Sequence, residues 1–143
     1  MSWSWYIYSP ILPVEMLDVE EAYDDALQAF FEAYPEVDDP FGEAVAGGQV
    51  PGKNEVVKQA RETGAKPGKK VLERLSGCKS AMEIGSVPSE GLDSRLQVSI
   101  LQFLLGKIGP CVFDWGDYEL ELSENTIEKL GARENRGPLS PSR

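Results

Sequence analysis

The chain of 143 residues contains no histidine. This absence excludes nucleophiles that are activated by histidine, histidine general bases and every zinc site that needs a histidine ligand. The chain has only two cysteines, Cys78 and Cys111, which form neither a C-x-x-C motif nor a spacing typical of metal sites. We expect both to be buried free thiols, although a single disulfide bond between them is the alternative.

Long apolar runs are absent too, because no stretch approaches the roughly 20 residues that cross a bilayer. The N-terminus, MSWSWYIYSPILPVEM, lacks the basic region and the continuous apolar segment of a secretory signal. We therefore expect a cytoplasmic protein that does not enter a membrane. The composition predicts one globular domain over residues 1–131, followed by a disordered tail over residues 132–143.

No complete catalytic or metal-binding motif is present. Residues 84–88 lack the second glycine of a G-x-S-x-G elbow, and residues 64–70 are one residue short of a phosphate-binding loop. The acids in residues 36–40 lack the spacing and the glycine of an EF-hand loop. We therefore expect no enzyme activity, no cofactor and no metal. The alternative is a small enzyme or ligand-binding domain that uses carboxylates, with its pocket between residues 92–108 and the sheet.

Positive side chains are missing from the first 52 residues, which hold eleven acids. Residues 53–80 hold eight bases and three acids, and residues 81–143 hold six bases and ten acids, so the net charge is −10. Such segregation bears on partners and association rates rather than on the fold. The basic block has no aromatic residue on which a base could stack, and the other blocks would repel a polyanion. We expect no direct binding of nucleic acid.

An amphipathic helix is predicted over residues 18–34, where apolar residues follow the spacing of one helix face. Asp18 is its expected N-cap and Pro35 ends it. Like charges four residues apart on the opposite face each cost a few tenths of a kcal/mol, a repulsion that a basic partner would relieve. A solvated face that keeps the protein soluble is the alternative. The acids of the helix and the following loop are Glu20, Glu21, Asp24, Asp25, Glu32, Glu36, Asp38 and Asp39.

The remaining elements are predicted from alternation, helical periodicity, glycine and proline. A strand over residues 2–8 ends at Pro10 and Pro13, and residues 41–52 form a loop with at most a short turn of helix. Helices are expected at 54–63, 67–76, 92–108 and 123–130, and strands at 81–87, 111–113 and 118–122. The last two strands form a hairpin or one bent strand. The order predicts an α+β fold, a small mainly antiparallel sheet of three or four strands with helices packed on one face.

Three features give the chain a resemblance to a known class of proteins. They are its acidic net charge, the base-free segment DVEEAYDDALQAFFEAYPEVDD and the acidic aromatic turn FDWGDYELEL. It resembles bacterial immunity proteins that neutralise polymorphic, contact-delivered toxins. The resemblance implies a non-enzymatic protein that binds and blocks a cognate toxin, often by covering the toxin's active site. Trp115, between Asp114 and Asp117, is then a candidate interface hot spot. A partly buried tryptophan over a hairpin turn is the alternative for Trp115.

We therefore expect an immunity or antitoxin-like inhibitor that occludes a basic protein partner. The alternative is a phage-type inhibitor that mimics the charge of nucleic acid. A toxin gene immediately upstream would favour the first, and a phage operon the second. The expected partner-binding residues are the eight acids of the helix and loop together with Asp114, Trp115 and Asp117.

Overall fold

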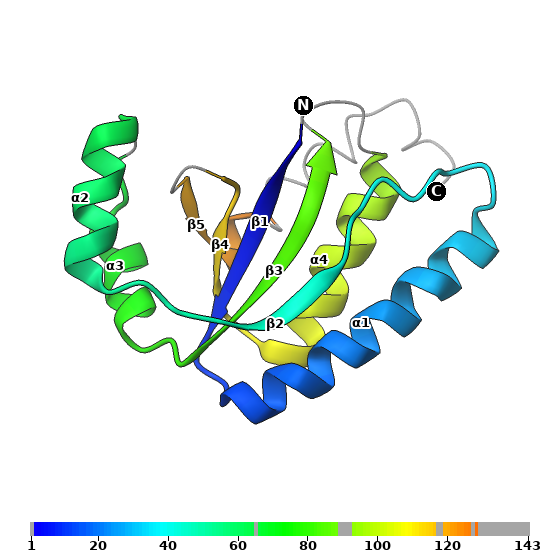
Figure 1. The fold of residues 1–143 in the computed structure, drawn as a ribbon, viewed down its shortest axis with the longest axis horizontal. Coiled ribbons are helices and arrows are strands. Elements are labelled where there is room, and N and C mark those ends of the chain that lie inside the picture. The colour runs from blue at the N-terminus through cyan, green and yellow to red at the C-terminus, as the bar shows by residue number, and fades with distance from the viewer. Residues whose placement is uncertain (1, 65, 89–92, 117–118, 127, 129–143) are drawn as a thin grey trace.

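The computed structural model describes the chain except for residues 1, 65, 89–92, 117–118, 127 and 129–143 (Figure 1). The predicted tail over residues 132–143 and the predicted site residue Asp117 therefore lie outside the described residues. Residues 123–126 are helical, in agreement with the predicted start of a last helix, whose remainder is only partly described.

Five antiparallel strands form a single sheet in the order β2-β3-β1-β4-β5. The chain is thus α+β, as predicted, but the sheet has five strands rather than three or four. The additional strand is β2, which lies within residues 41–52. The sequence predicts a loop there because of its glycines. The predicted hairpin is confirmed, because β4 and β5 pair side by side and do not form one bent strand. The strands are β1 (Ser2–Ser9), β2 (Ala44–Gly48), β3 (Ser80–Pro88), β4 (Val112–Asp114) and β5 (Leu120–Leu122).

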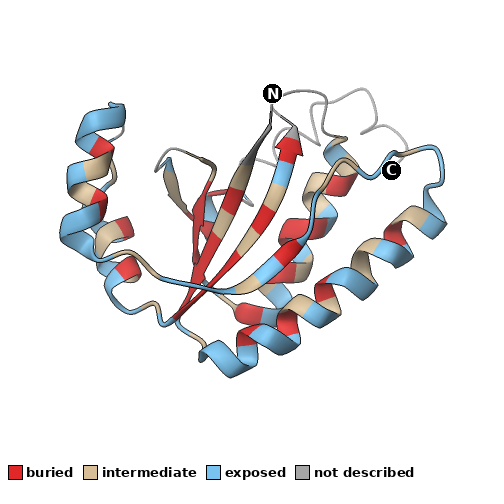
Figure 2. Cartoon of the chain, viewed as in Figure 1, coloured by how far each residue is buried: buried red, intermediate tan, exposed pale blue. Residues whose placement is uncertain are grey.

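The sheet is covered by helices on both faces rather than on one (Figures 1 and 2). Ile7 and Phe113 join the main core with α1 and α4, whereas their chain neighbours Tyr8 and Val112 join a second core with α2 and α3. The prediction of helices on one face is not confirmed, because successive residues of the central strands are apolar and bury both faces. The helices are α1 (Pro13–Ala33), α2 (Lys53–Thr63), α3 (Lys69–Ser76) and α4 (Ser94–Ile108).

The long helix α4 lies in the main core, close to the predicted bounds of 92–108. It begins after Asp93, whose side chain accepts a hydrogen bond from the Arg95 amide, and five of its residues are buried against the sheet and α1. None of the helices among the described residues has the length and the apolar character needed to cross a bilayer.

Helix α1 begins five residues before the predicted start. Pro13 opens the helix, and the Leu12 amide donates to a carboxylate oxygen of Glu15 at 3.0 Å. Proline suits the first position of a helix because its missing N–H would have no partner there. The sequence predicts that Pro13 ends the strand and that Asp18 caps the helix, but Asp18 lies inside the helix because Pro13 opens it.

Candidate functional site

An open groove runs between the second half of α1 and residues 35–42, with a volume of about 640 Å³. We call it the acidic groove. Its floor consists of Leu27, Phe31 and Val37, which are partly buried and pack against the main core. Four carboxylates surround this floor, and no lysine or arginine is among the described residues that line it. The lining residues are Asp24, Leu27, Gln28, Phe31, Glu32, Pro35, Val37, Asp38, Asp39 and Gly42.

Within the described residues, no basic side chain neutralises the charge of the acidic groove. Burial, and then the charges of Glu20, Asp25 and Glu43, raise the pKa of Asp24 above its ordinary value. In the part of the chain that the structure describes, no acid of α1 forms an ion pair with a lysine or arginine. A carboxylate among like charges is stabilised by any cation that approaches it.

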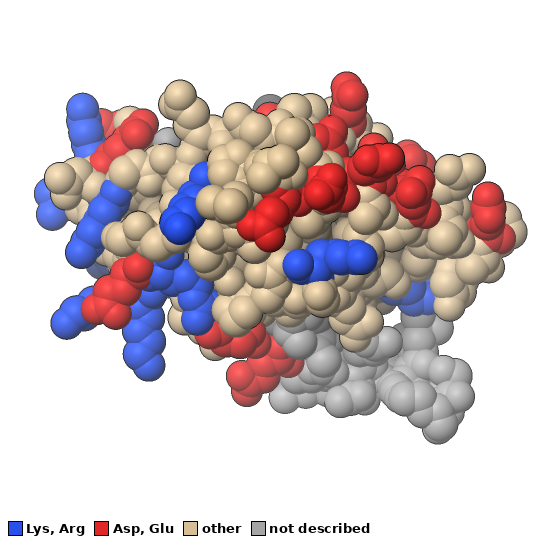
Figure 3. All heavy atoms as spheres, turned by 90° about the horizontal axis from the view of Figure 1, so that it is seen from below, with Lys and Arg blue, Asp and Glu red and all other residues tan. Residues whose placement is uncertain are grey.

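Acidic and basic side chains lie on different parts of the surface (Figure 3). In that view the lysines and arginines gather mainly over α2 and α3, at the left, and a band of acids runs along the side that carries α1. The segregation seen along the sequence is therefore also a segregation in space. It gives the protein an oriented field that can steer a charged partner toward one side.

Glu20 has a structural role that the sequence did not reveal. Its carboxylate accepts a hydrogen bond of 3.0 Å from the Ala46 amide on the edge strand β2. The bond occupies a backbone donor at the open edge of the sheet, where an unpaired strand could otherwise recruit another chain. Glu20 is therefore only partly available to a partner, whereas Glu21 and Asp25 on the same helix are exposed.

The loop beside the acidic groove, residues 35–42, is held by an ion pair and a hydrogen bond of its acids. Glu36 pairs with Arg95 at 3.2 Å, and the Arg95 guanidinium also pairs with Asp93 at 2.9 Å and lies 4.9 Å from the centre of the Tyr34 ring. One carboxylate oxygen of Asp39 accepts a hydrogen bond of 3.0 Å from the Phe41 amide. The charge of Glu36 is thus offset within the chain, whereas Asp38 and Asp39 remain exposed beside the groove.

The hairpin turn does not join the acidic groove. Asp114 is only 3% exposed and accepts a hydrogen bond of 2.9 Å from the Gly116 amide, which fixes the turn. The Trp115 ring lies edge-on to Trp5, with centroids 4.8 Å apart, and 5.1 Å from the Phe113 ring. Trp115 therefore has the geometry of a partly buried tryptophan over a turn, the alternative that we gave for it.

Six of the predicted acids thus lie on one surface, formed by α1 and its following loop. Asp24, Glu32, Asp38 and Asp39 line the acidic groove, and Glu21 and Asp25 are exposed on the helix beside it. Sequence reasoning missed Glu43, which adds to the field at Asp24. It also did not show that Leu27 and Phe31, two apolar residues of the predicted helix, would form the floor of a groove.

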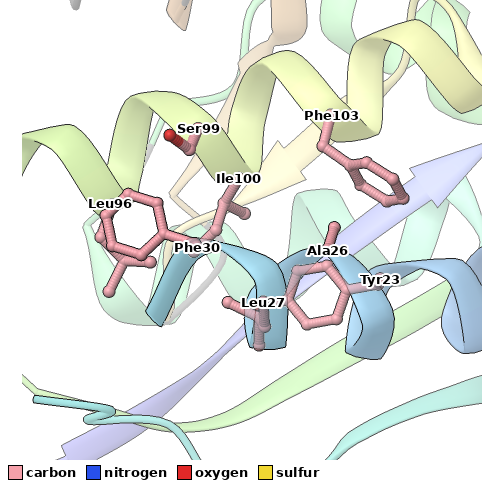
Figure 4. A pocket seen from close by; sticks show the side chains of 8 residues that line it. All are labelled: Tyr23, Ala26, Leu27, Phe30, Leu96, Ser99, Ile100 and Phe103. Atoms are coloured by element: carbon pink, nitrogen blue, oxygen red, sulfur yellow. The ribbon is translucent and has the colours of Figure 1, made fainter. Parts of the chain in front are cut away.

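A second, much smaller cavity of about 30 Å³ lies between α1 and α4 (Figure 4). Tyr23, Leu27 and Phe30 of α1 meet side chains of α4 around it, and the volume suits about one water molecule. The Tyr23 hydroxyl is buried with no hydrogen-bond partner among the described residues. Its burial, and then the charges of Asp39 and Asp24, raise its pKa. This cavity is far smaller than the roughly 300–1,000 Å³ of small-molecule pockets.

The thiols and carboxylates show no arrangement for nucleophilic or metal chemistry within the described residues. Cys78 and Cys111 are both free, and burial raises the pKa of the thiols to about 11 and about 12 respectively. Thiols with raised pKa values are poor nucleophiles at neutral pH. No cluster of three or more cysteines and acids in the described part of the chain could hold a metal ion.

Comparisons with protein-family models, with curated proteins and with solved structures found no match to this chain. What the protein binds is therefore inferred below from the chemistry of its own surfaces.

Proposed function

We propose that this protein is a non-enzymatic inhibitor that neutralises a basic protein partner, in the manner of an immunity protein or antitoxin. The observation that carries the proposal is the acidic groove, in which four carboxylates surround an apolar floor without a basic side chain among its described lining residues. Such an inhibitor would act in the cytoplasm of the cell that it protects, and occlude a cognate toxin.

The groove combines the two contributions that a tight and fast complex needs. Its carboxylates attract a basic segment from a distance and can raise the association rate constant toward about 10⁸ M⁻¹s⁻¹ at low salt. Its floor, formed by Leu27, Phe31 and Val37, offers apolar area that a partner can bury once it has docked. We therefore infer a partner segment that carries lysine or arginine around one or two apolar side chains.

The like charges on α1 support the same proposal. Asp24 is flanked by Glu20 at i−4 and Asp25 at i+1, and burial, followed by these charges, raises its pKa. A lysine at any of these positions would remove a repulsion worth a few tenths of a kcal/mol. The repulsion is relieved at no extra cost when a basic partner binds, so it favours the complex over the free protein.

The proposal is tested with paired charge reversals. The partner is first captured from the native host on the immobilised wild-type protein and identified, and its association rate constant is then measured by stopped flow. The variant Asp24→Lys plus Asp25→Lys is compared with the control Glu62→Lys plus Glu73→Lys. The control changes the net charge equally but lies on α2 and α3, where both glutamates are exposed.

We expect the α1 variant to associate at least about tenfold more slowly than wild type at low salt, with a smaller effect in the control. Circular dichroism spectra of both variants are expected to match wild type, because all four positions are exposed. Equal association rate constants for the two double variants would overturn the proposal, since the effect would then come from net charge alone.

A further inference from the structure

The sheet face that α2 and α3 cover carries a second concave surface, remote from the acidic groove. The strand pairing aligns one row of residues across all five strands on this face. The adjacent row, which includes Tyr8, Ala81 and Val112, is buried beneath α2 and α3. The first row is less covered, because Asp114 is its one buried residue and the others, Val45, Glu83, Tyr6 and Leu120, are partly or fully exposed.

A groove of about 430 Å³ opens beside this row, between the sheet, residues 49–51 and the first turn of α2. We call it the tyrosine groove. The rings of Tyr6 and Tyr8 stand parallel in it, with an interplanar angle of 5° and centroids 6.2 Å apart. Its volume falls within the range of small-molecule sites, which is roughly 300–1,000 Å³. Its lining residues are Tyr6, Tyr8, Gln49, Val50, Pro51, Glu55 and Asp114.

The tyrosine groove has a negative field around aromatic walls. Glu55 and Asp114 line it, and Glu83 accepts a hydrogen bond of 3.2 Å from the Tyr6 hydroxyl. Burial, and then the charge of Glu83, raise the pKa of Tyr6, in keeping with that field. No lysine or arginine is among the lining residues that the structure describes. Tyrosine faces together with carboxylates are the groups that recognise organic cations in proteins.

We propose that the tyrosine groove binds a small organic cation of the guanidinium or alkylammonium class. The cation would lie against the tyrosine rings with its charge directed toward the exposed carboxylate of Glu55, while the buried carboxylate of Asp114 adds to the negative field. This site is independent of the proposed inhibition of a basic protein, because the tyrosine groove and the acidic groove are lined by different residues.

Ethylguanidinium is the probe, and its neutral isostere N-ethylurea is the matched control. Each is titrated into the full chain while the ring resonances of the tyrosines are followed by NMR. We expect saturable binding of ethylguanidinium with a dissociation constant on the order of 1 mM, and shifts centred on Tyr6 and Tyr8. N-Ethylurea is expected to bind at least about tenfold more weakly, because it has the shape of the probe without its charge.

Variants then assign the binding to this groove. Glu55→Gln and Tyr6→Leu are each expected to weaken binding about two- to five-fold, whereas Tyr6→Phe, which keeps the ring, binds like wild type within about twofold. The exposed Glu62 on the same helix provides the matched control Glu62→Gln, which is expected to change nothing.

The proposal is overturned if N-ethylurea binds as well as ethylguanidinium, if no saturable shift is found, or if Glu62→Gln weakens binding as much as Glu55→Gln. Binding that persists in Glu55→Gln but is lost in the Asp24→Lys plus Asp25→Lys variant would also overturn it, by placing the cation in the acidic groove. The latter variant is otherwise expected to bind ethylguanidinium like wild type, whatever it does to the protein partner.

Discussion

Replacing Asp24 by asparagine is expected to stabilise the free protein at neutral pH. Asp24 lies one helical turn after Glu20 and beside Asp25, and the charge of Glu43 also acts on it. The repulsion between i and i+4 like charges costs a few tenths of a kcal/mol, so removing the charge of Asp24 is worth about 0.5 kcal/mol at low salt. Asparagine and aspartate have similar helix propensities, so the change isolates the charge.

The gain has a defined dependence on pH. The pKa of Asp24 is raised in the folded protein, so the group favours folding below its ordinary pKa of 3.8 and loses that contribution as the pH rises through the folded value. The advantage of Asp24→Asn is therefore expected at pH 7 and absent near pH 3. Salt of about 0.15 M shortens the Debye length to about 8 Å and reduces the advantage.

The assay is urea denaturation of wild type and Asp24→Asn at pH 7 and pH 3, each at low and at physiological ionic strength. The matched control is Glu73→Gln on α3, where Lys69 and Lys70 lie one turn earlier, so that removing the charge is expected to destabilise by a few tenths of a kcal/mol. A loss of stability in Asp24→Asn at pH 7 and low salt would refute the picture of an unrelieved acidic surface.

Three further variants test two contacts that stabilise the fold. Arg74 makes a bidentate pair with Glu124, one nitrogen to oxygen distance being 2.7 Å, and this bonding holds the pKa of Glu124 down at about 2. Urea denaturation of Glu124→Gln is expected to show a free energy of unfolding about 0.5–1 kcal/mol lower than wild type at pH 7, and this difference shrinks as the pH falls from 4.5 toward 2. A difference that is the same at pH 7 and pH 2 would contradict this expectation. Glu20→Met, which deprives the Ala46 amide of its acceptor, is expected to be about 0.5–1 kcal/mol less stable than Glu20→Gln, which retains an acceptor oxygen. Equal denaturation midpoints of the two Glu20 variants would show that the bond contributes nothing.

The sequence predicted those features of the fold that depend on neighbouring residues. Helical periodicity located α1 and a dense run of apolar residues located α4, and glycine located the end of α2, where Gly64 adopts a left-handed conformation with φ 84°. The strand β2 could not be predicted, because its residues are ordered by pairing with β3, which is far away in the chain. For the same reason the sequence could not tell which face of the sheet each helix would cover.

The candidate site, too, could be predicted only where it depends on neighbouring residues in the sequence. The one-signed face of α1 follows from local composition, and the structure keeps Asp24, Asp25 and Glu32 exposed on it. Whether an acid already bonds to another part of the chain depends on residues far away in the sequence, because Glu20 bonds to β2 and Glu36 pairs with Arg95 of α4. Those contacts leave a smaller set of carboxylates for a partner than the sequence suggested.

Hydrogen exchange of this protein alone and in complex with its captured partner shows whether the partner binds in the acidic groove. Binding there is expected to slow exchange in residues 35–42 and in the second half of α1, around Asp24 and Phe31, while α2 and α3 exchange as before. Protection confined to α2 and α3, with residues 24–42 unchanged, would contradict it.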